Sequence, residues 1–179
     1  SKATDRAAGL VQQILAFSRQ TQPERKPLFL NSLVKEVSKL LRASIPTTID
    51  IQLSLPAKQI VVFADVTQLH QVLMNLCTNA QHAIGEKAGL LEVEVQNAEI
   101  SLASKHDLID LPEGAYVRIS VKDSGYGMTP DVIERIFDPY FTTKEKGVGN
   151  GLGLAVVHGI VRKSGGTIKV ESALGKGTA

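Results

Sequence analysis

The chain has 179 residues, of which 43% are hydrophobic, and this is enough for one hydrophobic core. The formal net charge of +2 arises from 20 basic and 18 acidic residues in mixed order, so charge gives no case for a nucleic-acid-binding protein. No apolar run approaches the roughly 18 residues of a membrane-spanning helix, and the one cysteine, Cys77, excludes an internal disulfide and a cysteine-rich zinc site. The apolar neighbours of Cys77 predict a buried, inert thiol. The chain starts at Ser1 without a signal-peptide pattern, and we expect it to be an internal part of a longer protein.

The N-terminal region is predicted to be a helix followed by a linker. Apolar residues recur at spacings of three and four over residues 3–20, which is typical of an amphipathic helix. One helix cannot bury such a stripe alone, so we expect it to pack on a partner helix. Pro23 and Pro27 then mark a linker over residues 23–30.

A second helix and two short strands follow the linker. Apolar residues at helical spacing predict a helix from Asn31 that ends before Pro46. The segments TIDIQLSL (48–55) and IVVFAD (60–65) alternate with period two. We expect them to pair as antiparallel strands joined through PAKQ.

The middle of the chain changes from a helix to strands. Helical periodicity over residues 66–84 predicts a long helix, and strict alternation over 90–100 predicts a strand. Residues 101–115 form a polar insertion, expected to be a long hairpin loop, and 116–123 is a further strand. Near residues 130–136 we expect a short helix.

The last third combines a glycine-rich segment with a helix and a strand. Residues 124–153 are rich in glycine, threonine and charge, 152–165 has helical periodicity, and 167–172 is predicted to be a strand. Helices and strands cluster along the chain and do not alternate strictly. This order favours an α+β fold with helices on one face of a mixed sheet.

One face of the helix over 66–84 is polar. Asn75 and Asn79 are four residues apart, and His82 continues the same face. This face is either solvated or it binds a ligand. In the second case the carboxamide oxygens suit Mg²⁺, which usually accompanies phosphates.

A carboxylate is followed by two glycines in DSGYGM. Asp123 only accepts hydrogen bonds when it is ionised, and Gly125 and Gly127 permit the close approach of a flat ligand. The group suits an exocyclic amine such as that of adenine, although Asp-x-Gly is also a common turn.

A second glycine run directly precedes the helix over 152–165. Glycines at 147, 149, 151 and 153 leave backbone N–H groups free to face an anion at the helix N-terminus. The run is not a P-loop, because no Gly-Lys-Ser/Thr closes it, and its G-x-G-x-G spacing is not the dinucleotide fingerprint. A flexible linker is disfavoured because a periodic helix follows at once.

Two phenylalanines lie in the polar segment IFDPYFTTKEK. Phe137 and Phe141 flank a proline, which suggests a hinge that docks on something apolar. Lys144 is either a solvated lysine or a phosphate contact of the closed loop.

Taken together in one order, these motifs resemble the histidine-kinase branch of the GHKL ATP-binding superfamily. NLCTNAQHA resembles the N box, DSGYGM the first glycine box, FDPYF the F box and GNGLGLA the second glycine box. ESALGKGT resembles the third glycine box, and LVQQILAFSR the end of the second dimerisation helix. The resemblance covers essentially the whole chain, with 101–115 as a variable insertion.

The resemblance implies a two-layer Bergerat-type α+β sandwich. We expect a mixed, mostly antiparallel sheet of about five strands, covered by about three helices, plus the N-terminal helix. Residues 1–22 would be the C-terminal part of a dimerisation helix, 23–30 a linker, and 31–179 the ATP-binding catalytic domain with its final strand truncated.

The resemblance also implies roles for individual residues. Asn79 would bind Mg²⁺, Asn75 and Lys144 would serve catalysis at the triphosphate, and Asp123 would bind the adenine amine. Many relatives have a basic residue near the phosphates at the position of His82. Other residues implied at the nucleotide are Ala83, Gly125, Gly127, Met128, Phe137, Phe141, Gly149, Asn150, Gly151, Leu152, Gly153, Leu154 and Thr178.

The expected reaction is transfer of the γ-phosphoryl group of Mg–ATP to a histidine. Sister ATPases of this superfamily place a glutamate four residues before the metal-binding asparagine as the base for water, and this chain has Asn75 there. The resemblance places the acceptor histidine on the first dimerisation helix, so we expect it upstream of Ser1 and expect this chain not to phosphorylate its own histidines. His70 and His158 are predicted to be structural or exposed, and His106 lies in the insertion.

The resemblance also implies partners and leaves alternatives open. Expected partners are a response regulator receiver domain and a second protomer. We expect a cytoplasmic location and no direct membrane contact by this chain, whether or not its parent is anchored in a membrane. The alternatives are an ATPase that uses water, a non-catalytic nucleotide-binding module, and a protein serine kinase of the same superfamily.

Overall fold

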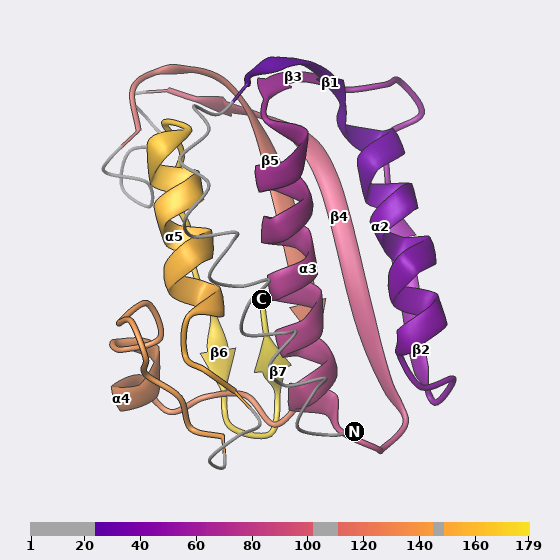
Figure 1. Ribbon diagram of the computed structural model, residues 1–179, viewed down its shortest axis with the longest axis vertical. Helices are drawn as coiled ribbons and strands as arrows, with labels where there is room; N and C mark the ends of the chain where they lie inside the picture. The colour runs from indigo at the N-terminus through magenta and orange to yellow at the C-terminus, as the bar shows by residue number, and fades with distance from the viewer. Residues whose placement is uncertain (1–23, 102–110, 145–148) are drawn as a thin grey trace, which may run out of the picture.

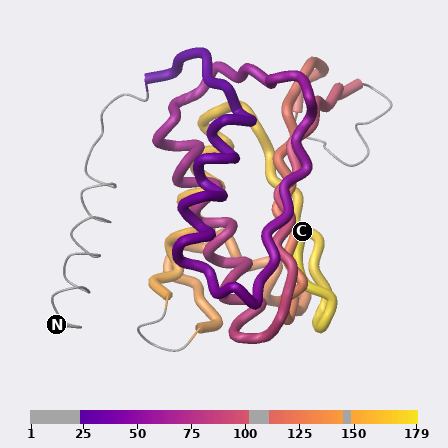
Figure 2. Tube along the Cα trace, turned by 90° about the vertical axis from the view of Figure 1, so that its right-hand side faces the viewer, coloured from indigo at the N-terminus to yellow at the C-terminus, as the bar shows by residue number. Residues whose placement is uncertain are grey.

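The protein folds into a layer of helices on a layer of strands, as a computed structural model shows for residues 24–101, 111–144 and 149–179. Helices α2 (Leu30–Ser44), α3 (Val66–Ile84) and α5 (Gly153–Lys163) lie side by side over one face of the sheet, as Figures 1 and 2 show from two directions. The predicted helix over 3–20 and most of the 101–115 insertion lie outside the described residues. Within the described ranges, no helix has both the length and the apolar content needed to cross a membrane.

The main sheet has five strands in the order β2-β4-β5-β7-β6. The pair β2–β4 is parallel, and the pairs β4–β5, β5–β7 and β7–β6 are antiparallel. The predicted α+β class with a mixed, mostly antiparallel sheet under three helices is therefore confirmed. The strands are β2 (Ile49–Ser54), β4 (Gly89–Ile100), β5 (Gly114–Asp123), β6 (Ser172–Ala173) and β7 (Gly177–Thr178).

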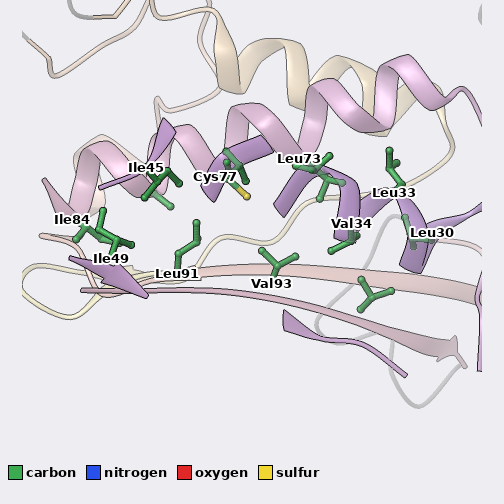
Figure 3. Close-up of a cluster of buried hydrophobic side chains, with 14 of the residues drawn as sticks. Leu30, Leu33, Val34, Ile45, Ile49, Leu73, Cys77, Ile84, Leu91 and Val93 are labelled. Atoms are coloured by element: carbon green, nitrogen blue, oxygen red, sulfur yellow. The ribbon is translucent and has the colours of Figure 1, made fainter. Parts of the chain in front are cut away.

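The hydrophobic core lies between the helices and the sheet. Figure 3 shows Leu73 and Cys77 of α3 above Leu91 and Val93 of β4, and both α3 side chains are only 1% exposed. A period of 3.6 residues directs these side chains to one side of the helix. The opposite, polar side of α3 is left for the residues of the site.

Helix α3 is fixed at its start by Asp65, whose carboxylate accepts a hydrogen bond from Gln68 N at 3.0 Å. Such an N-cap satisfies one of the backbone donors that a helix leaves unpaired. The second carboxylate oxygen of Asp65 accepts from Glu24 N at 3.0 Å, and Arg25 donates to Lys163 O at the end of α5. The segment that precedes the sheet is thereby attached to both helices that flank the site.

The predicted hairpin of residues 48–55 and 60–65 is wrong. Strand β3 (Val61–Ala64) pairs antiparallel with β1 (Lys26–Phe29), which lies inside the predicted linker. The cause is the buried Asn31, whose amide donates to Pro56 O at 2.9 Å and whose carbonyl accepts from Ile60 N at 3.2 Å. These bonds turn residues 56–60 toward the N-terminus of α2, so that β3 meets β1 and not β2.

The predicted strand over 167–172 is also shorter than expected, since only Ser172 belongs to β6. The register pairs Ser172 with Thr178, and Glu171 and Ala179 exchange backbone hydrogen bonds. Residues 167–170 belong to no strand of the described chain.

Candidate functional site

A cavity of about 1970 Å³ lies between α3, α5, β5 and the C-terminal hairpin β6–β7. The hairpin pairs with β5 only at the end of that strand, where Asp123 lies opposite Thr178. Of the predicted site residues, Gly125, Phe137 and Leu152 do not line it. Those that line it are Asn75, Asn79, His82, Ala83, Asp123, Gly127, Met128, Phe141, Lys144, Gly149, Asn150, Gly151, Gly153, Leu154 and Thr178.

The polar face of α3 points at the start of α5. The Asn75 amide donates to Gly153 O at 3.3 Å. A Cβ added to Gly153 would lie 3.6 Å from Asn75 Oδ1 and 3.9 Å from Asn79 Nδ2. The two asparagines therefore face the point where the glycine run enters the helix, and Asn75 acts as a hydrogen-bond donor there.

A lysine ammonium closes this end of the cavity. Lys144 Nζ lies 3.3 Å from Asn79 Oδ1 and 2.8 Å from His82 Nδ1. An ammonium group can only donate, so Nδ1 of His82 is the acceptor and its ring proton is on Nε2. Burial lowers the pKa of His82, and the charge of Lys144 lowers it further. Both effects favour the neutral form of His82, and burial also lowers the pKa of Lys144, the second basic group at this end of the cavity.

Asp123 forms the other end of the site, at the end of β5. Its carboxylate accepts a hydrogen bond from Gly125 N at 2.7 Å and another from the backbone N–H of Thr178. Burial raises the pKa of Asp123, and these two hydrogen bonds oppose the rise. The charged carboxylate is thus held half-buried, with its position fixed by the backbone of two glycine boxes.

The first glycine box packs directly on the end of α3. A Cβ on Gly125 would lie 2.6 Å from the carbonyl carbon of Ala83, so only glycine fits here. The neighbouring amide of Tyr126 donates to Ala83 O at 3.1 Å. This close approach fixes the distance between the α3 residues and Asp123.

Two aromatic contacts hold the F box. The ring of Phe137 stacks on His158 of α5, with ring centroids 5.0 Å apart, and Arg135 lies 4.4 Å over the ring of Phe141. Residues 136–141 are thus anchored on α5 and on their own preceding turn. The phenylalanines were predicted to dock on something apolar, but the ring contacts that the structure shows are with polar groups, a histidine ring and a guanidinium.

The F box is joined to the second glycine box by backbone contacts. Tyr140 N donates to Gly151 O at 2.9 Å, and both residues have positive φ, 67° and 66°. A Cβ on Gly151 would lie 2.4 Å from the Tyr140 carbonyl carbon. Left-handed backbone costs a non-glycine residue about 1 kcal/mol or more, so Tyr140 is held in place by its surroundings.

Helix α5 begins inside the cavity, without a side-chain cap and without an acidic residue in its first turn. The Asn150 side chain instead accepts from Leu152 N at 3.0 Å, in the turn before the helix. Gly147 lies outside the described residues, and a Cβ on Gly149 would lie 3.1 Å from Cδ of Lys144. The positive end of the helix dipole and Lys144 therefore lie at the same end of the cavity.

Sequence reasoning missed three side chains that shape the site. Ser172 accepts from Met128 N at 2.9 Å and connects the first and third glycine boxes. Arg135 and His158 hold the F box, as described above. A serine in a glycine-rich turn and a histidine on a helix carry no pattern that marks such contacts, because both depend on which segments the fold brings together.

The site combines an acceptor at one end with positive charge at the other. This suits a molecule that has an amine and phosphates, which is the composition of an adenine nucleotide. Among residues 24–101, 111–144 and 149–179, no three His, Cys, Asp or Glu side chains cluster as a metal site. A divalent cation would fit here with Asn79 Oδ1 as its protein ligand and with phosphate oxygens and water as its other ligands. In the structure this oxygen faces the Lys144 ammonium.

Comparisons with known proteins agree with this geometry. The family model of histidine kinase-, DNA gyrase B- and HSP90-like ATPases matches residues 64–179. Sensor kinase CckA from Brucella abortus (strain 2308) is 40% identical over 174 residues, which are 97% of this chain and 18% of CckA. Sensory histidine kinase/phosphatase NtrB from Rhizobium meliloti (strain 1021) is 34% identical over 173 residues, 94% of this chain and 44% of NtrB. The chain thus spans less than half the length of either relative.

Solved structures show the same fold. The nucleotide-free catalytic domain of histidine kinase ThkA is 33% identical with a TM-score of 0.68, and the match covers 87% of this chain and 91% of that domain. Full-length ShkA in complex with AMPPNP is 26% identical with a TM-score of 0.75, over 99% of this chain and 35% of ShkA. The chain belongs to the histidine kinase-, DNA gyrase B- and HSP90-like ATPase family, as an ATP-binding catalytic domain of the sensor histidine kinase type.

Proposed function

We propose that this chain binds Mg–ATP between α3 and the segment 141–153 and transfers the γ-phosphoryl group to a histidine on a dimerisation helix outside the chain. The observation that carries the proposal is the bond from the Asn75 amide to Gly153 O, one helical turn before Asn79. At this position the water-using ATPases resembled by the sequence have a glutamate as base. Here the side chain is a carboxamide that donates a hydrogen bond to the backbone.

The two ends of the site determine the direction of the nucleotide. The adenine amine would donate to Asp123, whose carboxylate faces the cavity between the two glycine boxes. The phosphates would lie at the start of α5, where Lys144 and the backbone N–H groups of the first turn stabilise negative charge. Mg²⁺ held by Asn79 Oδ1 and phosphate oxygens would neutralise charge on the transferring group.

The chain's own residues can position a phosphoryl group but offer no base for water at Asn75. A carboxamide cannot take a proton from water, so water attack is unassisted there. Phosphoryl transfer needs mainly alignment and charge stabilisation, which Lys144 and the α5 N-terminus can supply to an incoming side-chain nucleophile. The site therefore suits transfer to an imidazole better than hydrolysis.

The partners follow from the same assignment. The solved complex of histidine kinase ThkA with response regulator protein TrrA matches 99% of this chain at 27% identity, with a TM-score of 0.70. We propose that the parent of this chain likewise relays phosphate to a response regulator receiver domain. We also propose that residues 1–22 belong to a dimerisation helix that pairs with a second protomer, and that the catalytic domain begins with β1, which lies inside the linker expected over 23–30.

The test compares three fates of γ-labelled ATP. The chain alone should bind ATP, release little inorganic phosphate and acquire no acid-labile phosphohistidine. When a polypeptide containing the parent's complete dimerisation hairpin is added, label should appear on that hairpin's histidine. Steady phosphate release without the hairpin would support the water-using ATPase, and binding without transfer to the hairpin would support a non-catalytic module.

A further inference from the structure

The hydroxyl of Ser172 lies where three segments of the nucleotide site meet. Ser172 Oγ is 2.9 Å from Met128 N, 2.9 Å from Gly177 O and 2.9 Å from Thr178 Oγ1. Met128 belongs to the first glycine box and the other two residues to the third. One serine hydroxyl thus makes three contacts, although nothing in the sequence pattern marks it.

The directions of these hydrogen bonds follow from counting protons. The Met128 amide can only donate and the Gly177 carbonyl can only accept, so the single Ser172 hydrogen is directed to Gly177 O. The contact between the two hydroxyls is then a hydrogen bond only if Thr178 is the donor. The Thr178 hydroxyl hydrogen is therefore used, and its oxygen faces the surroundings as an acceptor.

The oriented hydroxyl belongs to the same wall of the cavity as Asp123. Both residues line the cavity, they are opposite each other in the β5–β7 pair, and the Thr178 amide binds the Asp123 carboxylate. An ionised carboxylate is also an acceptor only. The base end of the site thus presents two neighbouring acceptors, a pattern that matches a donor such as an exocyclic amine and repels a carbonyl oxygen.

We propose that Ser172 is a positioning residue for base specificity, which acts through Thr178 to favour 6-amino over 6-oxo purine nucleotides. This rests on the proposed function, since it assigns the base to the Asp123 end of the cavity. Without Ser172 the Thr178 hydroxyl is free to rotate and to donate to a 6-oxo group. Discrimination between the two bases then decreases, while Asp123 still favours the amine.

The experiment measures dissociation constants of ATP and ITP with Mg²⁺ by calorimetry. The proteins are the unaltered chain, Ser172→Ala, Thr178→Val and the double variant. We expect the ITP/ATP ratio of dissociation constants to fall roughly fivefold in Ser172→Ala, the worth of one neutral hydrogen bond. In the Thr178→Val background, Ser172→Ala should leave the ratio unchanged, because the residue through which it acts is gone.

Controls separate this role from a structural one. Ser44→Ala removes a hydroxyl that bonds to Leu41 O at the end of α2, away from the cavity, and should not change the ratio. If Ser172→Ala does not fold, Ser172→Cys keeps the size of the side chain while weakening its donor. Thermal unfolding of each variant confirms that the measured protein is folded.

The outcomes distinguish the two proposals. If the unaltered chain binds neither nucleotide, the proposed function fails. If it binds ATP better than ITP but Ser172→Ala keeps the same ratio, or if the double variant shows additive changes, the role of Ser172 is refuted while the proposed function stands.

Discussion

Replacing Asp123 with asparagine separates the binding role of this carboxylate from its effect on folding. Burial raises the pKa of Asp123 above its ordinary value of 3.8, although hydrogen bonds from Gly125 and Thr178 oppose the shift. Ionisation is therefore less favourable in the folded than in the unfolded chain, and at neutral pH the charge destabilises the protein without nucleotide. An asparagine keeps the shape and removes this cost, so the variant should be the more stable protein at pH 7.

The pH dependence of this gain has a definite sign. The pKa is raised on folding, so the stability linked to this carboxyl group is fully present below pH 3.8 and is lost as pH rises through the higher folded value. The difference in unfolding free energy between Asp123→Asn and the unaltered chain should thus be largest at neutral pH. It should disappear as the pH falls toward 3.8.

Nucleotide binding should change in the opposite direction. The lost interaction is a hydrogen bond from the adenine amine to a charged acceptor, which contributes about 1.5–3 kcal/mol. This corresponds to roughly 10- to 150-fold weaker binding of ATP. An asparagine also has only one acceptor oxygen, for which Gly125 N–H and the adenine amine would compete.

Urea unfolding between pH 4 and 8 measures the stability, and calorimetry with ATP at pH 7.5 measures the affinity. The combination of higher stability without nucleotide and weaker binding is what a half-buried binding carboxylate predicts. If Asp123→Asn were less stable at pH 7, or if it bound ATP as tightly as the unaltered chain, the reasoning about Asp123 would be wrong.

Three further expectations concern the packing around the site. Gly125→Ala forces a Cβ to within 2.6 Å of the Ala83 carbonyl carbon and should lower the unfolding free energy by about 1–3 kcal/mol. A Cβ at Gly159 has no atom within 4 Å, so Gly159→Ala should raise the unfolding free energy by up to about 1 kcal/mol. Equal effects of the two substitutions in urea unfolding would contradict this. Asp65→Ala removes the α3 cap and should cost about 1 kcal/mol, seen as a lower urea midpoint, and an unchanged midpoint would argue against the cap. Burial raises the pKa of Cys77 to about 12, so thiol reagents at pH 8 should label it only as fast as the protein opens, and rapid labelling of the native chain would refute its burial.

Local periodicity was sufficient for the elements whose apolar faces are buried in one direction. Helix α3 spans Val66–Ile84, the predicted range, because its core side chains recur at helical spacing and Asp65 and Gly85 mark its ends. The long strand β4 was found for the equivalent reason, since alternate residues such as Leu91 and Val93 are buried against the helices. The secondary structure of these two segments can therefore be predicted from their own sequences.

Strand partners could not be predicted in the same way. Alternation in residues 48–55 and 60–65 correctly indicates extended backbone but does not specify what it pairs with. The pairing depends on Asn31, which lies far away in sequence and bonds to the backbone of residues 56–60. The extent of β6 likewise depends on its pairing with β7, which the sequence of one strand does not specify.

The candidate site was predictable as a set of glycines, asparagines and one aspartate in a fixed order, but its electrostatics were not. Burial and the charge of Lys144 both lower the pKa of His82, and these two residues are 62 residues apart in sequence. The orientation of the Thr178 hydroxyl depends on Ser172, which in turn depends on the hairpin. Such proton assignments require the folded arrangement.

The central claim is that one nucleotide lies with its base at Asp123 and its phosphates at Lys144 and the start of α5. A crystal structure of the chain with Mg²⁺ and a non-hydrolysable ATP analogue measures this directly. We expect the Lys144 ammonium to leave Nδ1 of His82 for a phosphate oxygen, with the adenine amine within hydrogen-bond distance of the Asp123 carboxylate. An analogue bound elsewhere, or bound here with its base at the α5 end, would contradict the account.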